Sequence, residues 1–162
     1  MSITIAARRL LRAPSSLSFL AGGIGTGSWA ACLPALSRSK ALDPFDLGMV
    51  LLCFALGAMF SMMNASRMVP RLGTGLLSFI GAVVFGITLA LVPHITGLVP
   101  LAAVVMLSGA GFGTLDVTMN TQASFIEQRV GRRMMSSFHA IFSLGNLLGA
   151  GICGQILLSG GD

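Results

Sequence analysis

One carboxylate interrupts a long apolar segment of the sequence: Asp116, in the stretch GTLDVTMNTQ at residues 113 to 122. Asn120 follows four residues later, so in a helix with about 3.6 residues per turn the two side chains share a face. A second polar stripe, again at helical spacing, contains His139, Ser143 and Asn146. A buried carboxyl beside a histidine can take up and release protons, because burial disfavours the charged carboxylate and imidazole titrates near neutral pH.

Each of these residues also has a purely structural interpretation. The amides and Asp116 could lock one helix to a neighbour through hydrogen bonds, and His139 could lie at the membrane interface. Trp29, the only tryptophan, could anchor the chain at the interface or stack on a sugar-like ring. The hypothesis of a substrate- or proton-binding site uses Asp116, Asn120, His139, Asn146 and Trp29.

An intramembrane hydrolase is a third interpretation, and the sequence argues against it. Ser136 and Ser137 are too close in sequence to His139 for an obvious nucleophile geometry, and no oxyanion-hole motif is present. Three cysteines fall in apolar segments and their number is odd, so we expect small packing residues rather than disulfide partners or metal ligands: Cys32, Cys53 and Cys153. We expect no enzyme activity, no metal and no cofactor.

The elements that carry these residues are predicted to be membrane helices. Of 162 residues, 54% are hydrophobic and 9% are charged, against about 25% charged in soluble domains. Several uncharged runs exceed the ~20 residues that a spanning helix needs. The sequence predicts an all-α polytopic bundle forming one transmembrane domain over residues 1–162, without a soluble domain. Its helices are expected at about 17–36, 47–66, 74–92, 98–125 and 135–158.

The distribution of basic residues predicts the orientation in the membrane. Eight arginines precede the first span or lie in the second and fourth connections, and only Arg38 and Lys40 fall on the other side, offset by Asp43 and Asp46. The positive-inside rule then places the N-terminus in the cytoplasm and the C-terminus outside. The high isoelectric point reflects this topology, so we expect the lipid bilayer as a partner and no nucleic acid.

Glycine spacing predicts close helix packing. Gly23 and Gly27, and likewise Gly145 and Gly149, form Gly-x-x-x-Gly pairs, which let the backbones of membrane helices approach. A weak internal echo aligns GIGTGSWAAC at 23 to 32 with GFGTLDVTMN at 111 to 120, an offset of 88 residues. It pairs the first predicted span with the fourth and the second with the fifth, as expected for inverted repeats in secondary transporters.

Three segments resemble the N-terminal half of the major facilitator superfamily (MFS), most closely its fucose-permease-like and YbjJ-type bacterial branches. They are LGMVLLCFALGAM at 47 to 59, SRMVPRLGT at 66 to 74, and DVTMNTQASFIEQRVGRRMMSSFHAIFSLGNLLGAG at 116 to 151. The resemblance implies a transporter of two six-helix halves in the bacterial cytoplasmic membrane. It also implies proton-coupled symport of a small polar, possibly sugar-like, solute rather than drug export.

The resemblance also assigns a cytoplasmic gating loop, in which the family pattern is Gly-x-Leu-x-Asp-Arg-x-Gly. Arg71 and Gly73 match this pattern and Arg67 adds a charge, but Pro70 replaces the acidic residue. The chain holds about five of twelve helices, so we expect a truncated transporter. The alternative is a non-transporting protein or a half-transporter that assembles with itself or with a separately encoded C-terminal half.

Overall fold

The computed structural model describes residues 5–160, with side chains from Arg12 onward, so Arg8 and Arg9 of the predicted topology signal lie outside the described side chains. The helices are α1 (Ile5–Ser39), α2 (Pro44–Leu91), the 3-10 helix η1 (Val92–His94), α3 (Leu98–Val130) and α4 (Met135–Leu158). No strand occurs among the described residues. All four α-helices are long and apolar enough to cross a membrane. The predicted all-α membrane bundle is confirmed.

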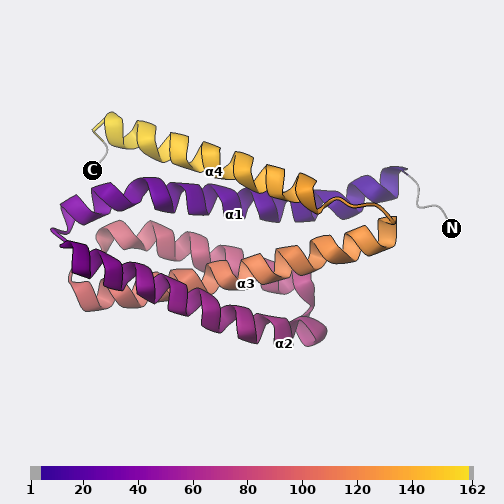
Figure 1. Ribbon diagram of the computed structural model, residues 1–162, viewed down its shortest axis with the longest axis horizontal. Coiled ribbons are helices and arrows are strands. Elements are labelled where there is room, and N and C mark those ends of the chain that lie inside the picture. The colour runs from indigo at the N-terminus through magenta and orange to yellow at the C-terminus, as the bar shows by residue number, and fades with distance from the viewer. Residues whose placement is uncertain (1–4, 161–162) are drawn as a thin grey trace.

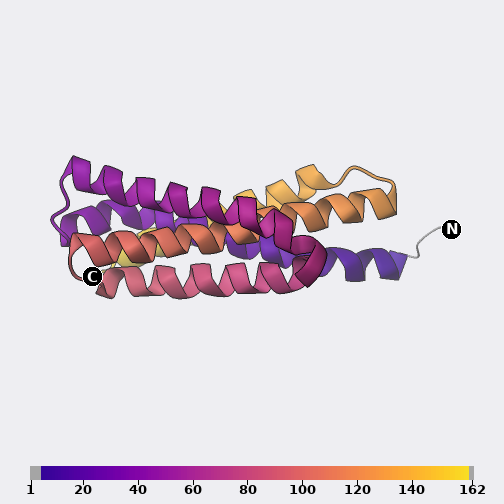
Figure 2. The ribbon, with the colours of Figure 1, turned by 90° about the horizontal axis from the view of Figure 1, so that it is seen from below.

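Helix α2 contains two of the five predicted spans. It runs along the bundle, reverses short of the end where α1 begins and α3 finishes, and returns (Figures 1 and 2). The residue at the reversal is Gly73, whose φ of 76° and ψ of 158° are not helical. This backbone region is essentially restricted to glycine, because a Cβ would clash with the chain. We refer to residues 44–72 and 74–91 as the first and second arms of α2.

The chain therefore makes five passes along the long axis of the bundle. Helix α1 begins at one end of that axis and α4 finishes at the other (Figures 1 and 2). In a membrane crossed by all five passes, these two helix ends lie on opposite sides. Which side is cytoplasmic stays a prediction from the basic residues.

Helices α1 and α4 pack as one pair through the predicted Gly-x-x-x-Gly motifs (Figure 1). A Cβ on Gly23 or Gly27 would collide with the carbonyl of Phe142 or Asn146 in α4. A Cβ on Gly145 or Gly149 would collide with the backbone of α1. The sequence-based prediction of close packing at these four glycines is confirmed.

The second tight pair joins α2 to α3. Gly109 and Gly113 of α3 lie against the backbone of Phe54 and Ala58 in the first arm, and Gly57 lies against Met106 in return. Two further glycines, Gly81 and Gly111, pack α3 against the second arm. Since lipid tails are as apolar as leucine side chains, this close backbone contact provides the packing attraction that apolar burial supplies in water.

The two glycine-packed pairs repeat the same contacts, but not at the offset that the sequence suggested. Gly109 meets the carbonyl of Phe54 as Gly23 meets that of Phe142, and Gly113 meets Ala58 as Gly27 meets Asn146. Residues in α4 follow their first-arm equivalents by 88 positions, as predicted, whereas α3 residues follow their α1 equivalents by 86. The matching motif is thus Gly-x-Gly-x-Gly at residues 23–27 and 109–113.

A disulfide joins Cys32 of α1 to Cys153 of α4, so the prediction that all three cysteines are unpaired packing residues is wrong. The glycine contacts bring the two helices close enough to hold the cysteine Cα atoms 6.5 Å apart, within the range that a disulfide bridges. Cys53 is free and half-buried. The odd number of cysteines reflected one bonded pair and one apolar packing residue.

Candidate solute- and proton-binding site

Asp116 lies in the middle of α3 and is half-buried. Its Oδ1 accepts a hydrogen bond from Asn120 Nδ2 at 3.2 Å, and the same amide nitrogen lies 2.8 Å from the backbone oxygen of Asp116. The predicted shared helical face is therefore present. Among the described residues, this bond is the only side-chain hydrogen bond to the Asp116 carboxyl, so its second oxygen can take a proton or a solute hydroxyl.

His139 lies in α4 on an exposed part of the helix. Its ring meets Phe19 of α1 edge-on, with centroids 5.6 Å apart. His139 is close enough to act electrostatically on Asp116. No hydrogen bond or ion pair joins these two residues in the described part of the chain, so the pairing of His139 with Asp116 stays a prediction.

Asn146 contributes to the contact between α1 and α4. Its Oδ1 lies 3.0 Å from the Thr26 hydroxyl, and Ser28 donates a hydrogen bond to the carbonyl of Gly149 one turn further along. These bonds flank the glycine contacts. Asn146 thus joins α4 to α1 by a hydrogen bond, as its structural interpretation expects. A role in solute binding stays a prediction.

Trp29 belongs to a group of four aromatic residues from three helices, which we call the aromatic cluster: Trp29, Phe54, Phe85 and Phe112. Trp29 stacks on Phe54 with centroids 5.8 Å apart, and Phe54 stacks on Phe112 at 6.0 Å. Phe112 lies one helical turn before Asp116. The cluster therefore links the predicted tryptophan to the helical stripe that carries the carboxyl.

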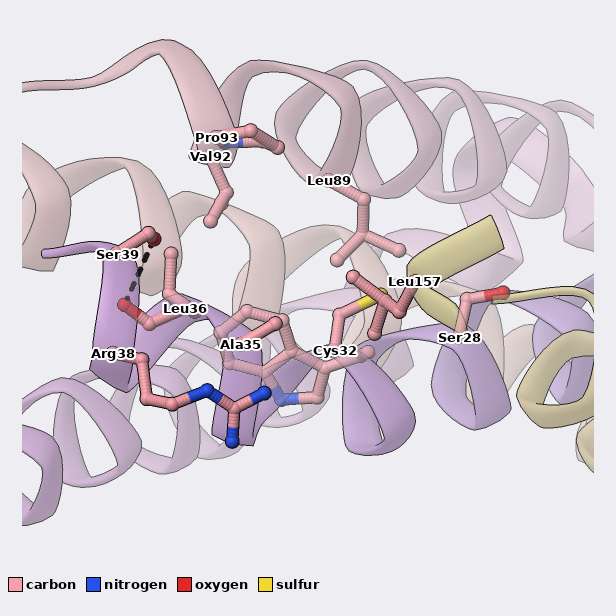
Figure 3. Close-up of a pocket in the computed structure, with 11 residues that line it drawn as sticks. Ser28, Cys32, Ala35, Leu36, Arg38, Ser39, Leu89, Val92, Pro93 and Leu157 are labelled. Atoms are coloured by element: carbon pink, nitrogen blue, oxygen red, sulfur yellow. Dashed lines mark hydrogen bonds between the residues drawn. The ribbon is translucent and has the colours of Figure 1, made fainter. Parts of the chain in front are cut away.

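A pocket of about 520 Å³ opens beside Trp29 at the end of the bundle where α1 and α4 finish. Apolar side chains line most of it, with the Arg38 guanidinium and two serines as polar groups (Figure 3). A volume of this size suits a small molecule. Of the five predicted site residues only Trp29 lines it, so the structure does not gather all five around one cavity.

Sequence reasoning missed Phe54, Phe85 and Arg38. The two phenylalanines carry no local signal, because an apolar residue in an apolar span predicts packing only. From the sequence, Arg38 indicates only topology, with its positive charge balanced by Asp43. In the structure, Asp43 instead accepts a hydrogen bond from the backbone N–H of Asp46 at 2.8 Å and caps α2.

The predicted gating loop is a helical reversal rather than an irregular segment. Arg67 and Arg71 are exposed on the first arm, and neither has a carboxylate partner among the described residues. Pro70 takes the place where the family pattern has an acidic residue, and Gly73 makes the bend. A gating role for Arg67, Arg71 and Gly73 stays a prediction.

Most of the chain aligns with bacterial transporters. An uncharacterised MFS-type transporter of Yersinia pestis is 32% identical over 144 residues, which are 89% of this chain and 38% of that protein. The uncharacterised transporter y4wD of Sinorhizobium fredii is 35% identical over 132 residues, 82% of this chain and 35% of that protein. The chain is similar to MFS-type transporters. This agrees with the superfamily resemblance and does not single out its fucose-permease-like branch.

A third relative, the membrane protein MosC of Rhizobium meliloti, is 28% identical over 134 residues, 83% of this chain and 33% of that protein. The chain thus spans about a third of the length of the curated relatives it matches. No family model matches the chain, and no solved structure gives a significant match. The similarity and the membrane-capable helices together describe a multi-pass membrane protein.

Proposed function

We propose that this chain is the N-terminal section of an MFS-type transporter that moves a small polar solute together with protons. The observation that supports this most is Asp116, a half-buried carboxyl in the middle of a membrane-capable helix. Such a group is costly within a bilayer and is a functional candidate by default. The similarity to MFS-type transporters supports the same function.

Asp116 would act as the proton site, because its side chain is bonded within its own helix rather than to a fixed cation. The carboxyl can then change protonation without breaking a contact between helices. His139 would modulate Asp116 through its charge, and Asn120 would orient the carboxyl. During transport the site must open first to one side of the membrane and then to the other. That change requires the whole transporter.

A sugar-like solute would contact Trp29, whose indole is positioned by Phe54 and borders the pocket of about 520 Å³. Aromatic rings suit the apolar faces of sugars, while the hydroxyl groups need polar partners, which around this pocket are the Arg38 guanidinium and two serines. We thus propose a fucose-permease-like branch of the superfamily and a sugar-like solute.

The test uses the full-length transporter that carries this segment, expressed in cells suspended in weak buffer. Adding neutral monosaccharides one at a time should make the medium alkaline as protons enter with the solute. Asp116→Asn removes the titrating group and should abolish this signal. Asp46→Asn removes a carboxylate at the start of α2 and should leave it unchanged.

Membrane levels and the Cys32–Cys153 disulfide, measured by immunoblot, show whether each variant inserts and folds. Undiminished proton entry in Asp116→Asn would refute the proton role. If the wild-type protein moves none of the monosaccharides, the sugar-like solute class is wrong.

The alternative of assembly with a second chain through the Gly-x-x-x-Gly motifs is not favoured. All four motif glycines already contact backbone within the chain. Another copy or a partner half would have to use other surfaces.

A further inference from the structure

Three arginines that the sequence presented only as topology markers converge on one hollow. Arg12 of α1 meets Arg132 and Arg133 of the turn between α3 and α4, around a space of about 190 Å³. The remaining lining residues are Val130, Met134 and Ser137. Arg12 precedes Arg132 and Arg133 by 120 and 121 positions in the sequence, so only the packing of α1 beside α4 brings them together.

The turn that carries Arg132 and Arg133 is fixed from both sides. Gly131 ends α3 in the left-handed conformation, with φ 67° and ψ 23°. Met134 is buried in the core with Phe138. The backbone of the two arginines between these anchors is thereby held beside α1, so a ligand would have to order their side chains but not the turn itself.

The local charge balance leaves the hollow positive. Glu127 is the acidic side chain closest to the turn, but its Oε1 accepts hydrogen bonds from the backbone N–H groups of Met134 and Met135. Its carboxylate therefore caps α4 and also attracts the charge of Arg133. Three guanidinium groups and the Ser137 hydroxyl remain as donors around the space.

We propose that this hollow binds the phosphate of an anionic phospholipid headgroup. Guanidinium groups present paired N–H donors that match phosphate oxygens, and a bound anion relieves the mutual repulsion of the three cations. The hollow lies at the end of the bundle where α3 finishes and α4 begins, which is the end predicted to face the cytoplasm. Basic pockets between helices at that membrane face suit anionic headgroups.

The site is distinct from the Asp116 region and does not depend on transport. None of Asp116, Asn120 and His139 lines the hollow. Lipid bound there would connect Arg12 of α1 to the α3–α4 turn. The two proposals can therefore fail separately.

The test compares lipid retention by the 162-residue chain, purified in detergent with equal amounts of phosphatidylglycerol and phosphatidylcholine, using native mass spectrometry. We expect the wild-type chain to retain one phosphatidylglycerol in preference to phosphatidylcholine. The double variant Arg132→Gln/Arg133→Gln should lose that preference about tenfold or more, since charge-assisted hydrogen bonds are the strong ones.

The matched control is Arg67→Gln/Arg71→Gln, which removes the same charge from the same predicted membrane face at two residues that do not line this hollow. It should keep the preference. Equal losses in the two double variants would show general surface attraction and overturn the proposal. Binding of inorganic phosphate with no preference between the two lipids would also overturn it. Thiol counting, with only Cys53 reactive in a folded chain, confirms that each variant folds.

Discussion

At the scale of single residues, Glu127 shows how a charged side chain can serve structure near the membrane surface. The N-terminus of a helix has backbone N–H groups without partners inside the helix. Met134, the residue before α4, supplies no side-chain cap, and Glu127 from the preceding helix accepts from the backbone of Met134 and Met135 instead. The α3–α4 turn and the start of α4 are held together by this one carboxylate.

Replacing Glu127 with alanine should free both N–H groups and destabilise the start of α4, because a helix start that loses its side-chain cap is less stable. Hydrogen exchange at the amides of Met134 and Met135 should accelerate accordingly. Gln128→Ala, at the exposed neighbouring position, should leave both amides protected. Unchanged exchange in Glu127→Ala would mean that the cap contributes nothing to the turn.

Asp116 and Asn146 are both polar residues in apolar spans, but their hydrogen-bond partners lie in different places. Asn146 faces Thr26 across the tight α1–α4 contact and bonds between helices. In the part of the chain that the structure describes, the Asp116 carboxyl bonds only to Asn120, within α3. Their sequence contexts look alike, because helical spacing gives the face on which a residue lies but not the helix that covers that face.

At the scale of elements, glycine position decides which helices can touch. Gly149 and Gly151 lie two residues apart in α4, yet a Cβ on Gly149 would collide with the backbone of Ile24, whereas nothing lies within 4 Å of a Cβ on Gly151. They form a matched pair for testing the α1–α4 contact, with one glycine buried in it and one outside it.

Gly149→Val should push α1 and α4 apart and lower the thermal stability of the purified chain, by about 1–3 kcal/mol if it behaves as an overpacked core. Gly151→Val adds the same side chain on an open face and should change the melting temperature little. Thermal unfolding in detergent, followed by circular dichroism, measures both. Equal effects would show that helix propensity, rather than the contact, determines the outcome.

At the scale of the whole molecule, the disulfide fixes α1 to α4 near the ends where both helices finish. The arginine distribution predicts that these ends face outward, where disulfides form and persist. The cross-link and the predicted orientation therefore agree. A disulfide at the opposite end of the same helices would have contradicted the orientation.

Counting thiols tests this agreement. In denaturant without reductant, maleimide should label one cysteine per chain, Cys53, and after reduction all three. Cys153→Ser should raise the first count to two, while Cys53→Ser should lower it to none. In a strain without periplasmic thiol oxidation, three thiols should be labelled from the start. A disulfide that still forms there would contradict the outward placement of these helix ends.

The sequence by itself determined the membrane class, the all-α bundle, the glycine packing motifs and the shared face of Asp116 and Asn120. These follow from composition and from the period of a single helix, which depend only on residues near one another in the chain. The sequence contains alignments of residues 23–27 at offsets of both 86 and 88, and only the backbone contacts show that α3 follows α1 at 86.

Only the tertiary structure decided which distant residues meet. It paired Cys32 with Cys153, built the aromatic cluster around Trp29, and gathered Arg12 with Arg132 and Arg133. Each of these groups contains residues that are far apart in the sequence. Their proximity depends on how the helices pack through their glycines. The type of a cysteine, a phenylalanine or an arginine does not by itself determine which distant residue it will contact.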